Sequence, residues 1–230
     1  MIILHHLNNS RAQRILWLLE ELGVDYDVKY YFRPTQIENR MQMAPLRAVH
    51  PLGKSPVITD GDVTLAESGA IVEYLVERYN RGQLPVPEIG TPERIQYLYW
   101  MHYAEGTLMP FILIKFICEG IATSKAPFFV RPILKGISGK MEEGMVLPQL
   151  KLQFDCMEQI LSEREWFTGN RFTAADLHMG FPLELAQQRA NLDQRWPKIT
   201  DYLQRIRARP AYQRAMVRDS APEKNKASAP

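Results

Sequence analysis

The hydrophobic pattern of the chain changes once along its length, and this change constrains the fold more than any other feature. Up to residue 80, short runs that alternate between apolar and polar residues are interleaved with helical stretches. After residue 92 the alternating runs stop, and apolar residues recur only at the three- and four-residue spacing of helices. The sequence therefore predicts a small α/β domain followed by a larger all-helical domain.

The segment between the two patterns reads as a linker. Residues 81–92 hold three prolines and two glycines, which favour a short extended connection. We therefore predict domains at 1–80 and 93–218, joined by this linker. Residues 219–230 are small and polar and are expected to form a flexible tail.

Within the first domain the signals follow the order β-α-β-α-β-β-α. One helix begins with Ser10 as its N-cap residue and ends at Gly23, and the last begins with Ser68 as its N-cap residue. A weak helical stretch ends at Met43. The predicted strands are 2–4, 26–31, 57–59 and 63–65.

The second domain is expected to contain only helices. Gly106 and Pro110 are four residues apart in the first of them, and a proline inside a helix clashes with the carbonyl four residues earlier, so a kink is expected there. Thr173 and Asp176 have the spacing of a capping box. The predicted helices are 93–121, 142–163, 173–188, 196–207 and 211–217.

Composition excludes several classes of function. The 28 basic and 26 acidic residues leave a formal net charge of +2, which gives no concentrated basic footprint for nucleic acid. The five histidines and two cysteines show no zinc-binding spacing, so no metal is expected, and Cys118 and Cys156 are expected to be buried. Neither a secretory signal nor a membrane-spanning run is recognisable, which favours a cytoplasmic protein.

Three segments are expected to meet where the strands of the first domain end, since ligands of open α/β layers bind at the carboxyl ends of strands. Ser10 opens a helix and can donate to an anion there; the simpler alternative is an N-cap serine. Lys54 can meet a carboxylate, or is a solvated surface lysine. The peptide bond between Ser55 and Pro56 would expose an unpaired backbone edge if it were cis. The last two candidates are Glu67, which could bind an ammonium group, and Ser68, which lies at a helix N-terminus.

Together these groups fit a small, extended zwitterion with two carboxylates and one amine. The motifs 8–14, 17–23, 50–56 and 65–71 occur in the order and spacing of a known family. Over about residues 1–215 the chain resembles the cytosolic glutathione transferases of bacteria and fungi that have serine at the catalytic position. The resemblance implies a thioredoxin-like domain followed by the all-helical C-terminal domain of these enzymes. It further implies a homodimer and glutathione as co-substrate, with no other cofactor.

The resemblance also implies a role for each candidate. Ser10 would donate a hydrogen bond to the glutathione sulfur and favour the thiolate, since a free thiol has a pKa of about 8.5 and is mostly protonated at neutral pH. Lys54 would meet the glycyl carboxylate. The backbone of Ser55, before a cis Pro56, would pair with the cysteinyl unit, and Glu67 and Ser68 would hold the γ-glutamyl end.

The second substrate is expected to be an apolar electrophile. The residues Tyr103, Met109 and Ile112 resemble those that face it in relatives, and their alternative is ordinary core. Arg11 lies at the mouth of the site or in solvent. Two other functions use the same site: a glutathione-dependent peroxidase or reductase, and a non-catalytic ligand-binding protein.

Overall fold

The computed structural model describes residues 1–33 and 44–227; for residues 44 and 221–227 it describes the backbone only. The weak helical stretch expected up to Met43 lies outside the described residues. The chain divides into two compact units. The first, the sheet unit, contains 1–86, 172–181 and 205–230, and the second, the helical unit, contains 87–171 and 182–204. The sequence predicted two continuous domains, whereas here two late segments belong with the sheet unit.

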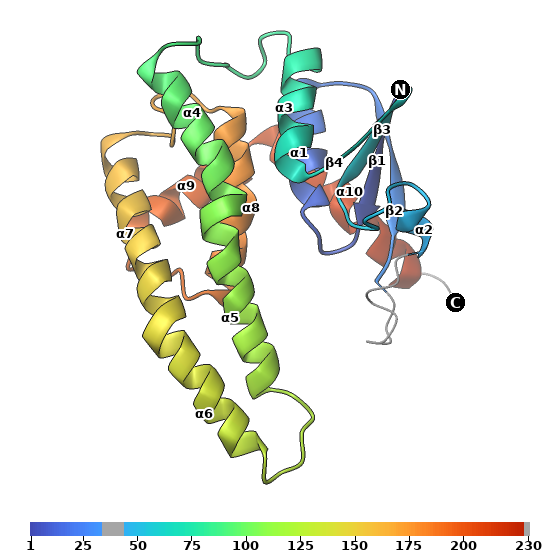
Figure 1. Cartoon of the computed structure of the whole chain (residues 1–230). Coiled ribbons are helices and arrows are strands. Elements are labelled where there is room, and N and C mark those ends of the chain that lie inside the picture. Colours follow the sequence, from blue (N-terminus) through green and yellow to red (C-terminus); the bar gives the residue numbers. More distant parts are fainter. Residues whose placement is uncertain (34–43, 228–230) are drawn as a thin grey trace. The chain divides into compact units, whose positions relative to one another are not determined.

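A four-stranded sheet forms the centre of the sheet unit (Figure 1). Its spatial order is β2-β1-β3-β4, with β1 parallel to β2 and antiparallel to β3, and β3 antiparallel to β4. This mixed sheet confirms the expected thioredoxin-like α/β fold. The strands are β1 Ile2–Leu7, β2 Tyr26–Tyr31, β3 Val57–Asp60 and β4 Val63–Ala66.

The register of these strands decides where the candidate site lies. His5 of β1 pairs with Val57 of β3, which in turn pairs with Ala66 of β4. The end of β1, the start of β3 and the end of β4 therefore lie at one edge of the sheet. The segments that follow or precede these three residues are the ones that the sequence predicted to meet.

The helices of the sheet unit are α1 Ala12–Leu22, α2 Ala44–Arg47, α3 Ser68–Tyr79 and α10 Pro210–Ala227. α1 packs against β1, α3 and α10, and it ends as predicted at Gly23, whose φ of 62° suits glycine. α10 continues to Ala227 and so extends into the residues predicted to form a tail, whose flexibility stays a prediction.

The two expected N-caps have different outcomes. The hydrogen-bond pattern makes Arg11 the residue before α1, but the Ser10 hydroxyl accepts from the N–H of Ala12 at 3.2 Å, which is the bond that an N-cap serine makes, so Ser10 caps the helix as predicted. The prediction for Ser68 is wrong, because Glu67 is the N-cap residue of α3 and Ser68 is its first helical residue.

The helical unit begins with α4 Pro92–Tyr103, and a further helix that sequence reading missed is α6 Arg131–Met141. Two helices, α8 Ala174–Arg189 and α9 Pro197–Arg207, have residues in both units. No helix of the described residues is long and apolar enough to cross a membrane. The remaining elements are η2 Ala104–Leu108, α5 Met109–Ala122, η3 Glu142–Val146 and α7 Leu147–Glu163.

The local deviation expected near Pro110 takes the form of a π-helical segment. In η2 the N–H of Met109 bonds to the carbonyl of Ala104, five residues earlier, which makes room for the proline ring. The same solution occurs in η3, where Leu147 bonds to Glu142 just before Pro148. Each proline lies four residues after a glycine, so the spacing that predicts a deviation near Pro110 also occurs at Pro148.

The capping box at the start of α8 is confirmed. The carboxylate of Asp176 accepts from the backbone N–H of Thr173 at 2.9 Å and from its hydroxyl at 2.9 Å. Asp176 is fully buried, so these bonds compensate much of the cost of placing its charge there. The flanking Phe172 and Leu177 are also buried, as a hydrophobic staple requires.

Candidate active site

Ser10 lies between the end of β1 and the start of α1, and it is almost fully buried. Its Oγ accepts a hydrogen bond from the N–H of Ala12, the first residue of α1, at 3.2 Å. The preceding residue, Asn9, has a positive φ of 52°, a conformation that asparagine tolerates better than most residues. The chain thus turns sharply after β1 and holds the Ser10 hydroxyl at the positive end of a helix.

Ser55 contributes a side chain as well as a backbone edge. The Ser55–Pro56 peptide bond is cis, as the resemblance implies. The hydroxyl of Ser55 donates to the carbonyl of His5 at 2.9 Å and accepts from the N–H of Leu7 at 3.1 Å, so it ties the cis-proline loop to β1. Sequence reasoning assigned a role to its backbone alone.

The hydroxyl oxygens of Ser10 and Ser55 lie 3.3 Å apart. Since a hydroxyl has one proton and that of Ser55 goes to His5, Ser10 is the donor in this contact. The Ser10 oxygen already accepts from Ala12. The Ser10 proton is therefore the group that can be redirected to a ligand.

Glu67 and Ser68 form the junction between β4 and α3. Glu67 has φ 71° and ψ 118°, a conformation that costs a non-glycine residue about 1–3 kcal/mol. Its carboxylate is exposed, and its carbonyl accepts from the N–H of Ile71 at 2.9 Å. Ser68 is buried as the first residue of α3. The unusual backbone turns the chain so that a carboxylate and a helix N-terminus adjoin each other.

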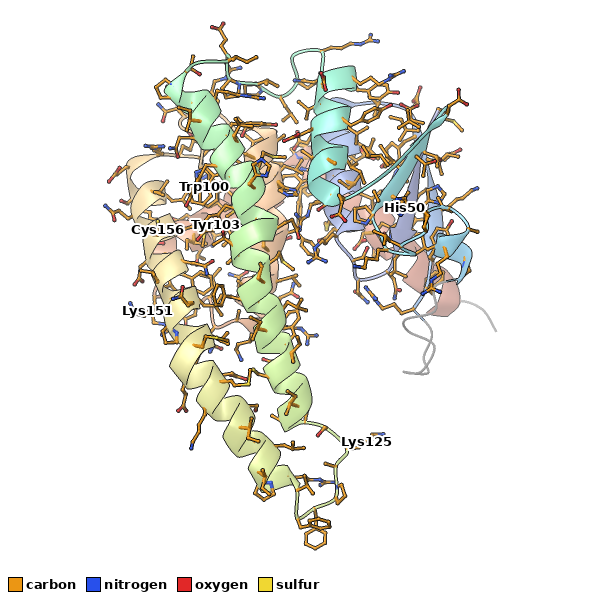
Figure 2. The ribbon with its side chains drawn as sticks, in the orientation of Figure 1. His50, Trp100, Tyr103, Lys125, Lys151 and Cys156 are labelled. Carbon is orange, nitrogen blue, oxygen red and sulfur yellow. The ribbon has the colours of Figure 1, made fainter. Side chains whose placement is uncertain are left out.

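Lys54 is exposed in the loop that leads to Pro56. The loop is closed by backbone bonds, among them Gly53 N–H to the carbonyl of His50 at 2.8 Å, and the ring of His50 accepts from the N–H of Leu52 at 3.4 Å. Figure 2 labels His50 in this part of the sheet unit. His50 therefore stabilises the turn that carries Lys54.

Six predicted residues thus belong to one region of the sheet unit, which we call the sheet-edge site. The register brings its three segments to one edge, and Ser10 and Ser55 are in direct contact. The region offers a hydroxyl at a helix N-terminus, a cation, a carboxylate and a backbone edge. The sheet-edge site comprises Ser10, Lys54, Ser55, Pro56, Glu67 and Ser68.

The residues expected to face an electrophile come from both units. Arg11 is half-buried in the sheet unit, while Met109 and Ile112 are buried in the helical unit. Tyr103 is buried against the rings of Tyr99 and Trp100, at centroid distances of 5.4 and 5.0 Å (Figure 2). Burial raises the pKa of the Tyr103 phenol, so it remains protonated at neutral pH. Contact of these four residues with a substrate stays a prediction.

The described residues hold no group of three or more His, Cys, Asp or Glu side chains that could bind a metal. Of the two cysteines, Cys118 is buried as expected, whereas the expectation for Cys156 is wrong because its side chain is exposed on α7.

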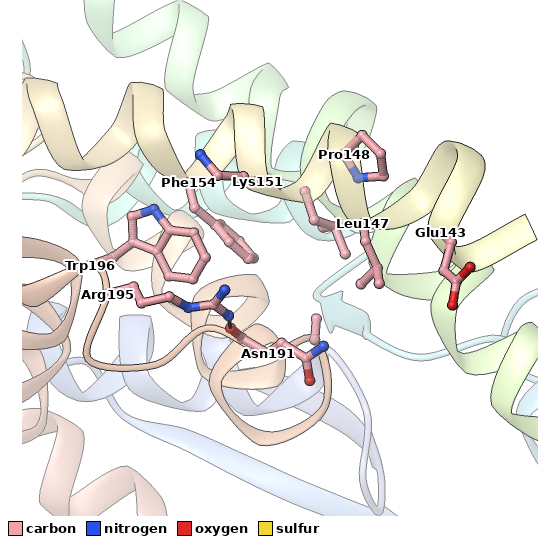
Figure 3. Close-up of a pocket in the computed structure, with 10 residues that line it drawn as sticks. Glu143, Leu147, Pro148, Lys151, Phe154, Asn191, Arg195 and Trp196 are labelled. Atoms are coloured by element: carbon pink, nitrogen blue, oxygen red, sulfur yellow. Dashed lines mark hydrogen bonds between the residues drawn. The ribbon is translucent and has the colours of Figure 1, made fainter. Parts of the chain in front are cut away.

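A pocket of about 420 Å³ lies in the helical unit between α7 and the segment after α8 (Figure 3). Phe154 and Trp196 form part of its apolar wall. Its cations are already paired, Lys151 with Asp155 at 2.6 Å and Arg195 with Asp193 at 2.9 Å. None of its lining residues belongs to the predicted site.

Comparison with known proteins relates both halves of the chain to one family. The model described as "Glutathione S-transferase, N-terminal domain" matches residues 1–77, and "Glutathione S-transferase, C-terminal domain" matches residues 121–210. Glutathione S-transferase 3 of Schizosaccharomyces pombe is 38% identical over 212 residues, covering 92% of this chain and 85% of that protein.

Two further relatives agree with this match. Glutathione S-transferase 1 of Saccharomyces cerevisiae is 30% identical over 220 residues, which cover 92% of each chain. The crystal structure of a glutathione S-transferase from Actinobacillus pleuropneumoniae is 31% identical, covers 96% of this chain and 93% of its own, and superposes with a TM-score of 0.74.

Proposed function

Because the chain belongs to the glutathione S-transferase family, we propose that the sheet-edge site binds reduced glutathione and presents its sulfur as a thiolate to an apolar electrophile. The observation that carries this proposal is the meeting of Ser10 and Ser55 at the edge where β1, β3 and β4 end or begin. A ligand paired with the backbone of Ser55 would bring its sulfur close to the hydroxyl of Ser10.

The two ends of glutathione find complementary charges in the same unit. The exposed Lys54 is suited to the glycyl carboxylate, and the exposed Glu67 to the ammonium group of the γ-glutamyl unit. The N-terminus of α3 at Ser68 is suited to the second carboxylate. Glutathione is then the co-substrate, and the proposal needs no resident cofactor.

Ser10 has a specific task in this mechanism. At neutral pH only a few per cent of a free thiol with a pKa of about 8.5 is ionised. A hydrogen bond donated by Ser10 to the sulfur, together with the N-terminus of α1, stabilises the thiolate and lowers the pKa of the bound thiol. The sulfur then forms a bond to an electrophilic carbon, and either a leaving group departs with its electron pair or an addition product takes up a proton.

An ultraviolet difference titration with reduced glutathione near neutral pH tests this proposal. The wild-type protein is expected to show a thiolate band that Ser10→Ala abolishes, while Ser10→Ala keeps most of its affinity for glutathione. Ser10→Thr, which retains a hydroxyl, is the matched control. Binding without a thiolate band in the wild type would favour a ligand-binding protein, and a thiolate consumed by peroxides in place of carbon electrophiles would favour a peroxidase.

We propose further that two copies form a homodimer. The resemblance implies this state, and an exposed apolar stripe on α4 supports it, with Ile95, Leu98 and Tyr99 at helical spacing. Light scattering after gel filtration measures the mass directly, and Ile95→Ser is expected to weaken the dimer. A cytoplasmic location stays a prediction.

A further inference from the structure

The helical unit ends in a hairpin whose tip is unusually basic. We define the hairpin tip as residues 121–141, which comprise the end of α5, the connecting loop and α6. These residues include no Asp or Glu, and their cations are Lys125, Arg131, Lys135 and Lys140. Figure 2 shows Lys125 in the connecting loop, far along the hairpin from Trp100 and Tyr103. The tip therefore carries a concentrated positive charge on a chain whose net charge is only +2.

The same segment exposes large apolar side chains. Phe128 is 81% exposed and Phe129 66% exposed in the connecting loop, and their rings form an edge-to-face pair with a centroid distance of 5.6 Å. Ile133 and Ile137, one turn apart on α6, are 60% and 52% exposed. Scattered exposed apolar residues need no explanation, but a cluster of this kind marks an interaction surface.

Three acidic residues flank the tip, Glu119, Glu142 and Glu143, and they offset part of its charge. Glu119 and Glu142 both bind the buried ammonium group of Lys115, at 3.1 and 3.0 Å. Their hydrogen bonds and charges raise the pKa of Lys115 despite its burial, so the lysine stays charged. The two carboxylates and one ammonium leave one net negative charge at the base of the tip, and the exposed Glu143 adds a second, against the four cations of the tip.

We propose that the hairpin tip binds the surface of an anionic phospholipid bilayer. Phe128 and Phe129 insert at the boundary between headgroups and acyl chains, and the lysines contact the anionic headgroups. Since no described helix can cross a membrane, this association is peripheral. A second copy of the chain fits less well, because a symmetric contact would bring two sets of the same positive charges together.

This surface would bring the enzyme to the place where its substrates accumulate. Apolar electrophiles partition into bilayers, and a transferase held at the bilayer surface meets them at a higher local concentration. The inference does not depend on the catalytic role of Ser10, since every residue that carries it lies in the helical unit.

Vesicle flotation of the full-length protein tests the proposal. Vesicles of phosphatidylcholine are compared with vesicles that also contain phosphatidylserine, at low and high salt. Retention is expected on the anionic vesicles only and is expected to weaken at high salt. Replacing Lys125 and Lys135 together by Gln should lower the partition coefficient about 25-fold, since each cation near an anionic surface contributes about fivefold.

The apolar contribution is tested by Phe128→Ser with Phe129→Ser. We expect the partition coefficient to fall roughly tenfold or more, because two exposed rings no longer leave water. Ile89→Ser is the matched control, since Ile89 is 92% exposed in the linker outside the tip, and it should bind vesicles as the wild type does. Turnover of a water-soluble electrophile should be unchanged in all three variants, which shows that they fold.

Two results would overturn the proposal. One is equal retention on neutral and anionic vesicles, or none on either. The other is a combination of two observations: the wild type binds no vesicles, and the Phe128→Ser, Phe129→Ser variant differs from it in mass by light scattering. The tip would then be a contact between copies of the chain.

Discussion

The hydroxyl oxygen of Ser55 lies 3.3 Å from that of Ser10 while its own proton is directed to the carbonyl of His5. One side chain thus links the end of β1, the cis-proline loop and the proposed catalytic residue. Ser55 is expected to act as a positioning residue, whereas Ser10 is expected to contact the sulfur. The two roles predict opposite results for the two alanine variants.

Ser55→Ala is expected to lower the free energy of unfolding by about 2 kcal/mol, because the N–H of Leu7 and the carbonyl of His5 lose a partly buried partner. Its bound glutathione should still show the thiolate band, since Ser10 keeps its hydroxyl. Urea unfolding and the ultraviolet titration measure the two effects. Ser55→Thr retains a hydroxyl and serves as the control; loss of the band in Ser55→Ala would give Ser55 a direct part in the chemistry.

Glu67→Gly is expected to raise the free energy of unfolding and to lower the affinity for glutathione. Glycine adopts the φ of 71° without strain, so the free energy of unfolding should rise by about 1 kcal/mol. The affinity for glutathione should fall roughly tenfold or more, because the ammonium group loses its charged partner. Glu67→Gln keeps the backbone and should show the affinity loss alone. Unchanged affinity in both variants, measured by calorimetry, would remove Glu67 from the site.

The stability of the protein is expected to fall as the pH drops below 6.5, in part through His5. Burial, with a smaller effect of Lys29, lowers the pKa of His5 from 6.5. The unfolded chain therefore takes up a proton at a higher pH than the folded chain, and stability is full above 6.5 and is lost as the pH falls toward the folded pKa. Urea midpoints measured on both sides of pH 6.5 should change less in His5→Asn than in the wild type. An identical pH dependence would contradict this assignment.

Asp176→Ala is expected to lower the free energy of unfolding by about 2 kcal/mol, since it removes the buried acceptor of both Thr173 bonds. Asp193→Ala is the control, because its exposed carboxylate accepts from the backbone N–H of Arg195 at 3.0 Å and from its guanidinium at 2.9 Å, and the loss of these exposed bonds should lower the urea midpoint less. Equal changes of the urea midpoint in the two variants would show that the capping box contributes no more to stability than an exposed ion pair.

Sequence reasoning succeeded where periodicity and local motifs carry the information. The extent of 26–31 as a strand and the end of α1 at Gly23 follow from alternation and from a residue suited to a positive φ. The side-chain role of Ser55 could not be found in this way, because its partners His5 and Leu7 are backbone groups far away in the sequence.

The helix α6 was missed for a different reason. Its residues include Pro132, Gly136 and Gly139, which together read as a loop. In the structure Pro132 lies in the first turn, where a helix tolerates proline, and the remainder packs along α5. Tertiary contact outweighs the low intrinsic propensity of this segment.

The paired π-helical segments η2 and η3 also bear on how such chains can change in evolution. Each holds one residue more than a regular helix needs, and each extra residue turns the side chains beyond it by about 100° around the helix axis. Loss of one residue next to Pro110 alone would rotate α5 relative to its neighbours, which include η3. A compensating loss next to Pro148 is then required, so the two glycine–proline spacings should appear and disappear together among related sequences.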